Sequence, residues 1–351
     1  MRGYRYLKQS NKLEKIAEIK EELTVTVLER CGESASKLIF GAGREVSELI
    51  TRQYLLLRLA DLNLNRALLC AIGKRNAFVD FPMPREWRHV LRRHGLEVRN
   101  IKASVFWIIY CAFMLIHGMA KIAWILFRGL RQTLARRSKS LGRYAYFSGL
   151  ATGNLPRPCK DGRSHDIVTW YARWPGRVPD LDALCHGVVG AEPTVVDELR
   201  VVPISTAVPP IVGIGRSAAF LAWGVCAGGI AFFSLLRGRW WNALMLGEAA
   251  SAAAVRLNKT ELPARDYLFH NSSWIYRPLW TYEAEKKGSR ISFYFYSTNA
   301  EKFKRFDRYP SLYYGWRAVN WPLYLVWDKY QADFVRRAAG EAANIAVVGP
   351  I

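Results

Sequence analysis

Two short apolar runs, 267–269 and 291–296, have the aromatic and aliphatic composition of buried strands, and a helical pattern over 276–286 separates them. Strand, helix and strand in that order predict a parallel pair joined by a right-handed crossover, which restricts this part of the chain to an open α/β sheet. Each run stops at polar residues: His270, Asn271, Ser272 and Ser273 after the first, and Ser297, Thr298 and Asn299 after the second. Because the carboxyl ends of such strands meet at one edge of the sheet, we expect these side chains to share a crevice.

The same polar residues also have a simpler interpretation, because Ser, Thr and Asn are favoured helix N-caps. We prefer the crevice, since two successive strands end in the same way. Within it, His270 is the residue best placed for proton transfer, and Arg277 is a candidate for binding a phosphate. A salt bridge from Arg277 to Glu283 or Glu285 is an equally weighted alternative.

Two further strand ends supply weaker candidates. Strands are expected over 166–171, ending near Arg173, and over 183–185, ending at His186. Asp166 would lie at the start of the first of these strands, and would therefore lie at the edge of the sheet away from the crevice. The sequence thus adds Arg173 and His186 to the expected substrate-binding residues.

The charge balance favours an anionic partner, because 51 Lys and Arg stand against 29 Asp and Glu, a formal net charge of +22. No nucleic-acid-binding motif is recognised and the basic residues are spread along the chain, so we expect no nucleic-acid partner. The six cysteines show no CxxC spacing and the carboxylates are dispersed, so no metal site is predicted. Scattered cysteines fit a reducing, cytoplasmic setting.

Two apolar stretches, 104–127 and 218–236, are long enough to span a bilayer, although His117 and Lys121 interrupt the first. A membrane-crossing hairpin of both would translocate the strongly basic residues that follow the first stretch, against the positive-inside rule. Basic residues precede that stretch as well, so a single span has no preferred orientation. A helix lying in the interface of an anionic membrane and a buried pair of core helices are the alternatives that the sequence leaves open.

These patterns divide the chain into four regions. Residues 1–100 are expected to form an α/β segment, with strands over 23–28 and 77–81, and residues 101–143 a membrane-associating helix with a basic stretch. Residues 144–340 are expected to form a Rossmann-like domain with a parallel sheet that includes the apolar helix 218–236, and residues 341–351 the first strand of a further α/β unit.

Four runs of the sequence carry a resemblance to a known family: NLPRPCKDGRSHDIVTWYARW, GRWWNALMLGEAA, LFHNSSWIYRPLWTYEAEKKGSRISFYFYSTN and NIAVVGPI. They resemble the bacterial polysaccharide biosynthesis proteins named for a PFTS motif, and the resemblance begins near Ala77. That family is regarded as glycosyltransferase-like, of the two-domain GT-B type. Its naming motif is expected after the strand that starts at Ile345, where this chain stops, so the resemblance implies an acceptor-side half that is inactive without a donor half.

The resemblance also implies roles for the candidate residues. His270 would be the general base for the acceptor hydroxyl, Asn271, Ser272 and Ser273 would hydrogen-bond the acceptor, and Arg277 would reach a phosphate of the nucleotide-sugar donor. The donor is a substrate, and no cofactor is expected. The expected partners are a glycan or lipid-linked acceptor and an anionic membrane surface, with the protein peripheral to the cytoplasmic face of the inner membrane or crossing it once. The alternative is a membrane-associated structural or binding protein without catalytic activity.

Overall fold

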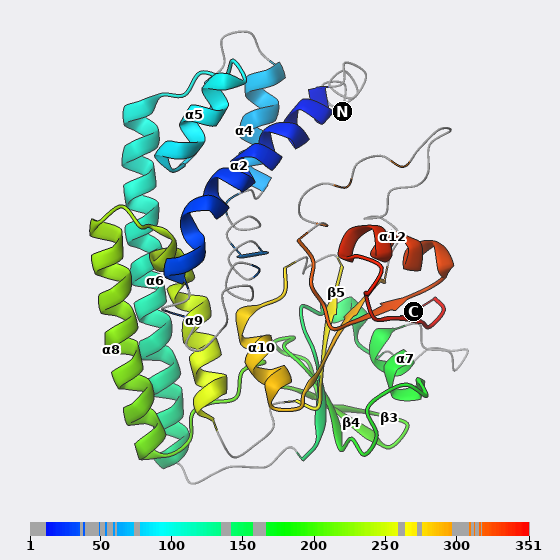
Figure 1. Ribbon diagram of the computed structural model, residues 1–351. Coiled ribbons are helices and arrows are strands. Elements are labelled where there is room, and N and C mark those ends of the chain that lie inside the picture. Colours follow the sequence, from blue (N-terminus) through cyan, green and yellow to red (C-terminus); the bar gives the residue numbers. More distant parts are fainter. Residues whose placement is uncertain are drawn as a thin grey trace. The chain divides into compact units, whose positions relative to one another are not determined.

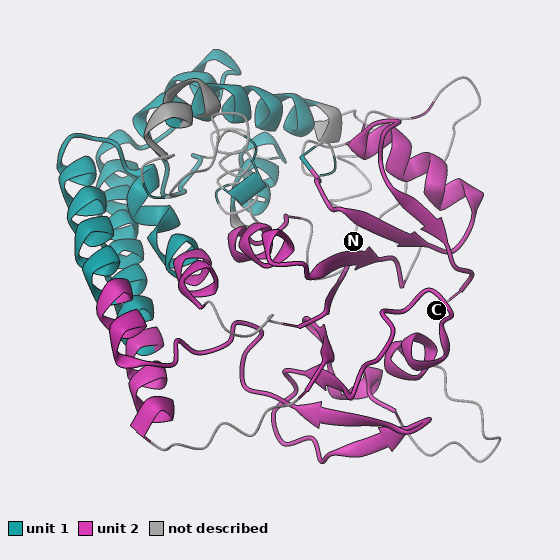
Figure 2. Ribbon diagram, turned by 60° about the horizontal axis from the view of Figure 1, so that its bottom comes forward, with its two compact units in different colours: residues 1–124, 221–250, 313–318 teal, residues 125–220, 251–312, 319–351 magenta. Residues whose placement is uncertain are grey.

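The computed structural model describes residues 12–35, 62–73, 78–134, 142–156, 166–258, 264–271, 276–296 and 318–350, together with a few single residues between these ranges. The chain divides into two compact units (Figure 2). Unit 1 comprises residues 1–124, 221–250 and 313–318, and unit 2 comprises residues 125–220, 251–312 and 319–351. The unit boundaries therefore fall within helices, and differ from the sequence regions expected above.

Unit 1 is helical in the part that the structure describes. Its elements are α2 (Lys12–Ala35), α4 (Leu62–Gly73), α5 (Arg85–Arg93), the first part of α6 (Asn100–Leu134), the second part of α8 (Ile214–Leu236) and the first part of α9 (Trp241–Leu257). The basic helix α5 ends before Gly95, a residue with φ of +73°.

The two strands expected in residues 1–100 are wrong. Residues 23–28 lie inside α2, where Ile16, Ile19, Leu23 and Val27 recur at helical spacing and are all buried. Their alternating Leu, Thr and Val residues satisfy a strand pattern locally, but the longer helical period decides the outcome. Residues 78–81 form no strand, although the Val79 amide donates to the carbonyl of Glu97 at 2.9 Å.

Unit 2 is built on an eight-stranded sheet, which confirms the expected mixed α/β class (Figure 1). The strands are β1 (Tyr144–Phe147), β2 (Ala183–His186), β3 (Thr194–Val196), β4 (Leu199–Pro203), β5 (Asp266–His270), β6 (Arg290–Tyr294), β7 (Leu323–Val326) and β8 (Ile345–Val347). Their order across the sheet is β3-β4-β2-β1-β5-β6-β7-β8, and every neighbouring pair is parallel except β3 with β4.

The strand order reverses at β1. From β1 the chain adds β2 and then β4 on one side, and after α8 and α9 it returns to place β5 on the other side of β1. Helix α7 (Ile167–Arg173) covers one face, where the rings of Phe147 and Tyr171 lie 5.5 Å apart. Helix α10 (Leu279–Lys286) covers the other, where Trp280 contacts Tyr267 at 4.8 Å. This is doubly wound topology, and its switch point lies between the carboxyl ends of β1 and β5.

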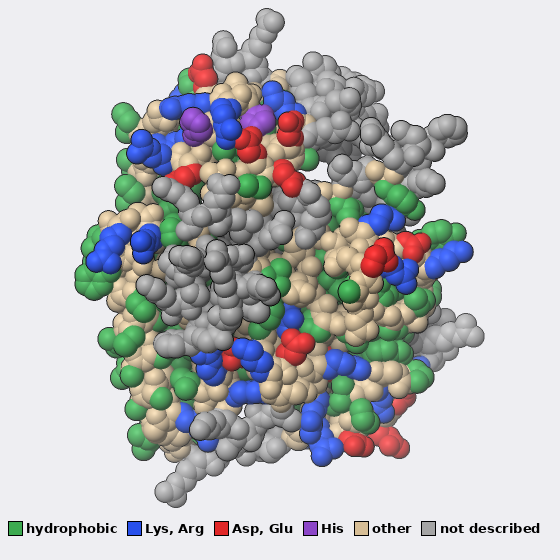
Figure 3. Space-filling view, in the orientation of Figure 1, with side chains coloured by type: hydrophobic (Ala, Val, Ile, Leu, Met, Phe, Trp, Pro, Cys, Tyr) green, Lys and Arg blue, Asp and Glu red, His purple; other side chains and the backbone are tan. Residues whose placement is uncertain are grey.

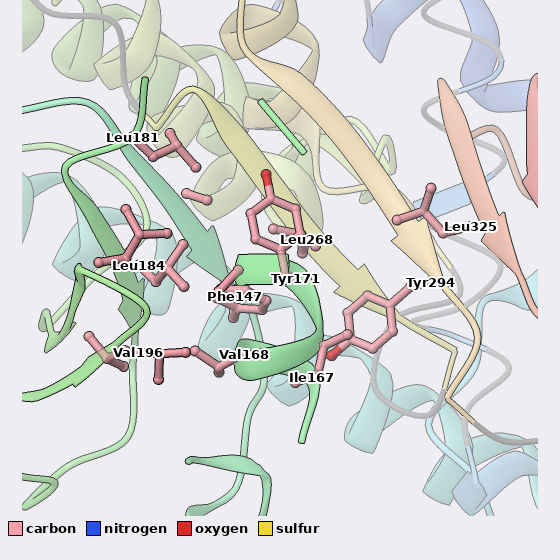
Figure 4. Close-up of a cluster of buried hydrophobic side chains, with 14 residues drawn as sticks. Phe147, Ile167, Val168, Tyr171, Leu181, Leu184, Val196, Leu268, Tyr294 and Leu325 are labelled. Carbon is pink, nitrogen blue, oxygen red and sulfur yellow. The ribbon is translucent and has the colours of Figure 1, made fainter. Parts of the chain in front are cut away.

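The core on the α7 face consists of alternate strand residues packed against the helix (Figure 4). Phe147 of β1 and Leu268 of β5 are fully buried there with Val168 and Tyr171 of α7, and Tyr294 of β6 lies in the same cluster. Complete burial of each such side chain contributes about 1.5–3 kcal/mol to folding. This packing fixes the orientation of the strands whose carboxyl ends form the switch point.

Helix α7 replaces the strand expected over 166–171. The β-branched and aromatic residues there suggested a strand, but Asp166 caps a helix by accepting hydrogen bonds from the amide of Thr169 at 2.8 Å and from its hydroxyl at 2.9 Å. Asp166 therefore lies at the start of the helix that follows β1, near the carboxyl edge of the sheet. The expectation that it lies at the opposite edge is wrong.

The amino ends of β5 and β6 are joined by a buried polar network. The Asp266 carboxylate is completely buried, and it accepts hydrogen bonds from the Tyr171 hydroxyl at 2.7 Å, from Arg290 Nε at 2.9 Å and from the Ser292 hydroxyl at 2.9 Å. A buried carboxylate is tolerated where it is paired and hydrogen-bonded in this way. The network therefore connects α7 to two central strands at the edge away from the switch point.

Strand β8 completes the sheet of unit 2. Helix α12 (Lys329–Ala339) precedes it and begins after Asp328, whose carboxylate accepts from the amide of Gln331 at 2.9 Å. After α12 the chain forms β8, which pairs in parallel with β7 in the register Tyr324↔Ile345. The last residues therefore join the same sheet, whereas the sequence suggested the first strand of a separate α/β unit.

Candidate functional site

The switch point brings the end of β1 to the end of β5 through a single side-chain contact. His270 is the last residue of β5, and its Nε2 lies 3.2 Å from the carbonyl oxygen of Gly149. Gly149 follows β1 with φ of +75°, a left-handed conformation that glycine adopts readily. The Ser148 amide donates to the carbonyl of Leu268 at 2.9 Å, which keeps the two strand ends together.

This contact determines the tautomer of His270. A carbonyl oxygen can only accept, so in the neutral imidazole Nε2 carries the hydrogen and Nδ1 keeps its lone pair. Nδ1 is buried and has no hydrogen-bond partner among the residues that the structure describes, and the whole side chain is only 6% exposed. Burial lowers the pKa of His270, and the hydrogen bond to Gly149 opposes that effect in part. The site therefore offers a neutral base at neutral pH.

Aromatic side chains border His270 on β6. The Tyr294 ring lies 5.7 Å from the imidazole and is buried, whereas the Tyr296 ring lies 5.3 Å away, edge to face, and is 39% exposed. The Asn271 amide donates to the carbonyl of Tyr294 at 3.2 Å, and its Oδ1 accepts from the Tyr296 amide at 3.5 Å. Asn271 thus holds the end of β6 in place, and Tyr296 forms the accessible rim of the site.

His186 lies at the carboxyl end of β2, on the other side of β1. It pairs in register with Phe147, as Leu268 does, so His186 and His270 belong to the same face of the sheet. Nδ1 of His186 accepts from the Val188 amide at 3.2 Å, which leaves the hydrogen on Nε2. Nε2 is buried without a partner in the described part of the chain, and burial lowers the pKa of this histidine. His186 therefore supplies a hydrogen-bond donor where His270 supplies an acceptor.

Arg277 forms the salt bridge that the sequence left as an alternative. Its buried guanidinium pairs with Glu285, donates to the Thr281 hydroxyl at 3.1 Å and lies 3.8 Å over the Tyr282 ring. Glu283, the other expected partner, pairs instead with Arg256 and Lys286. Because these groups occupy the guanidinium, we leave Arg277 out of the proposed site.

Arg173 does not lie at a strand end, so the sequence-based placement is wrong. It is the last residue of α7, and it is exposed and forms an ion pair with Asp197 at 2.6 Å in the turn between β3 and β4. That turn precedes β4 and lies at the amino edge of the sheet. Because a helix that follows a parallel strand runs back along the sheet, its last residue comes to the edge opposite His270.

The carboxylates, described above as dispersed, include one Asp-x-Asp triplet, Asp180-Leu181-Asp182, so the prediction that the chain lacks such a triplet is wrong. It precedes β2 at the amino edge of the sheet, where Asp182 accepts from the Arg143 amide at 2.7 Å. Among the described residues, no group of three His, Cys, Asp or Glu side chains is arranged to hold a metal ion.

Five expected site residues lie outside the described residues, and their roles stay predictions: Ser272, Ser273, Ser297, Thr298 and Asn299. The sequence analysis missed two others. Gly149 acts through its backbone carbonyl, which has no residue-type signature, although a glycine directly after a strand marks a tight turn. Tyr296 was expected only as part of a strand, yet it lies beyond β6 and faces His270.

The fold and site together define a class: a doubly wound α/β protein with a buried imidazole base at its switch point. Residues 225–351 match the model of a family described as "Polysaccharide biosynthesis PFTS motif protein". This match supports membership of the chain in that family, confirms the resemblance over residues 225–351 and indicates a role in polysaccharide biosynthesis. It includes β5 to β8 and His270. Neither the comparison with curated proteins nor the comparison with solved structures gave a match.

Proposed function

We propose that this protein is a GT-B-type glycosyltransferase whose doubly wound sheet binds the acceptor, and that it transfers a sugar from a nucleotide-sugar donor to a glycan or lipid-linked acceptor of a bacterial surface polysaccharide. The observation that carries the proposal is the Nδ1 lone pair of His270, held by Gly149 in the tautomer that a general base needs. The family match supports the polysaccharide context. Doubly wound sheets bind ligands at the switch point, which is where this base lies.

The chemistry assigns a step to each group. The acceptor hydroxyl donates a hydrogen bond to Nδ1 of His270, and its oxygen attacks the anomeric carbon of the donor sugar as Nδ1 takes the proton. The bond between that carbon and the diphosphate oxygen breaks, and the nucleoside diphosphate leaves with the electron pair. The resulting imidazolium is stabilised by the Gly149 carbonyl, to which Nε2–H already donates.

The neighbouring side chains orient the acceptor in this proposal. Nε2–H of His186 donates to an acceptor oxygen, and the Tyr296 ring covers the apolar face of a sugar. Ser272, Ser273, Ser297, Thr298 and Asn299 supply further hydrogen bonds to the acceptor. The nucleotide-sugar donor is a substrate, and the proposed reaction requires no separate cofactor.

The test introduces the His270→Gln substitution into the gene in its native organism and measures the amount of surface polysaccharide. We expect loss of the polysaccharide, since removing a general base lowers the rate by about 10²–10⁴-fold. His89→Gln is the matched control, because His89 is exposed on α5. Unchanged polysaccharide with normal protein levels in the His270→Gln strain would rule out this base.

A second measurement uses the purified chain and needs no turnover. Saturation-transfer NMR with oligosaccharide acceptors should show contact with the protein, and His186→Gln and Tyr296→Ala should weaken it.

A competing candidate, a membrane-associated binding protein without catalysis, is favoured by the exposed apolar helices described below. For that protein, His270→Gln would leave the polysaccharide unchanged, so the allele test separates the two functions.

A further inference from the structure

Helices α6 and α8 present large apolar side chains outward. Two described helices are long and apolar enough to cross a membrane, and only 22% of the most apolar window of α6 and 33% of that of α8 are buried. Core helices of a water-soluble protein are mostly buried, so the expected alternative of a buried helix pair does not fit. Within unit 1, the apolar face is defined by exposed residues of both helices: Ile109, Phe113 and Ile116 of α6, and Val225, Phe232 and Phe233 of α8.

Small residues lie where α6 and α8 contact each other, and large apolar residues lie on their outer side, whereas two amphipathic core helices would bury their large apolar residues between them. The helices approach each other through glycine, because a Cβ at Gly224 would lie 2.7 Å from Ile122 and a Cβ at Gly228 would lie 2.6 Å from Met119. These contacts pair rising numbers on α8 with falling numbers on α6, so the helices are antiparallel. Small residues at the contact and large apolar residues outside are typical of helices in a lipid environment.

Basic residues flank the apolar face at one end of the pair. Arg99 and Lys102 lie at the start of α6, and Arg237 and Arg239 follow α8; all four are exposed. The Trp107 and Trp240 rings pack 5.1 Å apart, which brings the two ends together. Asp80 pairs with Lys102, and it neutralises one charge of the four. Figure 3 shows hydrophobic side chains along the edge formed by α8 and α6, with Lys and Arg side chains near the upper end of α8.

The inner side of the pair is covered by protein. Helix α9 is buried along its length in unit 1, Leu246 lies against Gly118 of α6, and the carbonyl of Leu244 accepts from the Tyr54 hydroxyl at 3.1 Å. A spanning hairpin would have to carry these neighbouring protein segments into the bilayer with it, where their backbone polar groups would have to be satisfied internally. A pair that lies flat inserts only its outer side chains.

From these observations we propose that the apolar face of α6 and α8 docks in the plane of an anionic lipid bilayer, with the four flanking basic residues on the headgroups. Apolar burial and attraction to anionic lipid together set the affinity of such interfacial helices. The proposal does not depend on glycosyl transfer, and His270→Gln should bind lipid as the wild type does.

The first test measures binding of the full chain to vesicles after dilution from mild detergent. Vesicles of phosphatidylcholine with phosphatidylglycerol should bind more strongly than phosphatidylcholine alone, and added salt should weaken the difference. Phe113→Glu should reduce binding about tenfold, and Arg237→Gln should reduce binding to the anionic vesicles about fivefold. Val25→Glu is the matched control, because Val25 is an exposed apolar residue of α2. Equal effects of Phe113→Glu and Val25→Glu would overturn the proposal.

The second test uses two exposed cysteines, Cys226 on α8 and Cys70 on α4. In a Cys159→Ser background, anionic vesicles should protect Cys226 from a water-soluble maleimide and leave Cys70 reactive. If the protein binds vesicles while Cys226 stays reactive, another surface docks and the proposal fails. The proposal also fails if Cys226 is protected in the absence of lipid and sedimentation shows that the protein is a dimer. In that case a second copy of the chain would cover the apolar face.

The third test separates a flat pair from a spanning one. Spin labels at Leu221→Cys, Val225→Cys and Phe232→Cys should report similar depths in the bilayer if α8 lies in its plane. If α8 crosses the membrane, the depth will change steadily along the helix, since each residue advances about 1.5 Å. That depth gradient would overturn in-plane docking.

Discussion

The carbonyl oxygen of Gly149 lies 3.2 Å from Nε2 of His270, and it decides which nitrogen of the imidazole is free to act as a base. The contact joins the turn after β1 to the end of β5, the two strands between which the sheet order reverses. Fold topology and tautomer therefore have a common origin, because the reversal of strand order at β1 places the Gly149 carbonyl beside the His270 ring. Four predictions test this arrangement and the network that supports it.

The first prediction concerns the titration of His270. Burial lowers its pKa below the usual 6.5, against the opposing effect of the Gly149 carbonyl, and the neutral ring should show the Nε2–H tautomer. Nitrogen-15 NMR of histidine-labelled protein, with the His270→Gln spectrum for assignment, measures both. A pKa at or above 6.5, or an Nδ1–H tautomer, would contradict the site geometry.

The same shift has a consequence for stability. Because the pKa is lower in the folded state, the unfolded chain binds the proton first as the pH falls below about 6.5. The contribution of His270 to the free energy of unfolding should therefore be constant above that pH. As the pH falls from about 6.5 to the pKa of the folded state, this contribution should decrease. His270→Gln should remove this part of the pH dependence, as measured by urea unfolding across the pH range.

The second prediction compares two glycines with nearly equal φ. Gly149 has φ of +75° and Gly190 has φ of +76°, and no heavy atom lies near enough to obstruct a Cβ at Gly190. Alanine at either position should destabilise the fold by about 1–2 kcal/mol, the strain of a left-handed conformation. Only Gly149→Ala should also shift the pKa of His270 and impair polysaccharide synthesis. Equal effects on the site from both variants would argue against a role for the Gly149 carbonyl.

Local patterns were sufficient to predict much of unit 2. Residues 183–185 and 267–269 were expected as strands and lie in β2 and β5, because short apolar runs bounded by polar residues are a direct sequence signature of buried strands. The neighbouring parallel arrangement of β5 and β6 also followed, since one helix separates them. His270 could be singled out because it ends such a run.

Other features depended on information that no local window contains. Residues 166–171 have strand composition, but the Asp166 cap and the packing of Tyr171 on Phe147 make them a helix, and this moved Arg173 to the far edge. The switch point depends on the order of all eight strands, so neither the partner of His270 nor the shared face with His186 could be read from the sequence. In residues 23–28, a helix of 24 residues overrode a strand-like alternation.

The third prediction concerns the buried carboxylate at the opposite edge of the sheet. Arg290→Met removes the cationic partner of Asp266, which is fully buried, and leaves an uncompensated charge. Such a loss should lower the free energy of unfolding by about 3–5 kcal/mol. Arg336→Met is the control, because Arg336 forms an exposed pair with Asp333 and should change stability by less than about 1 kcal/mol. Chemical denaturation of both variants measures the difference.

The fourth prediction tests whether the Asp266 network acts as a unit. The Tyr171 hydroxyl and Arg290 Nε both donate to Oδ2 of Asp266, at 2.7 Å and 2.9 Å. Tyr171→Phe alone should lower the free energy of unfolding by about 1.5–3 kcal/mol, as expected for a hydrogen bond to a charged group. Because the two donors share one oxygen, the double variant with Arg290→Met should not equal the sum of the single effects, and groups in direct contact typically couple by about 0.5–3 kcal/mol. A strictly additive cycle would mean that Tyr171 and Arg290 stabilise the Asp266 carboxylate independently, and that the network does not act as a unit.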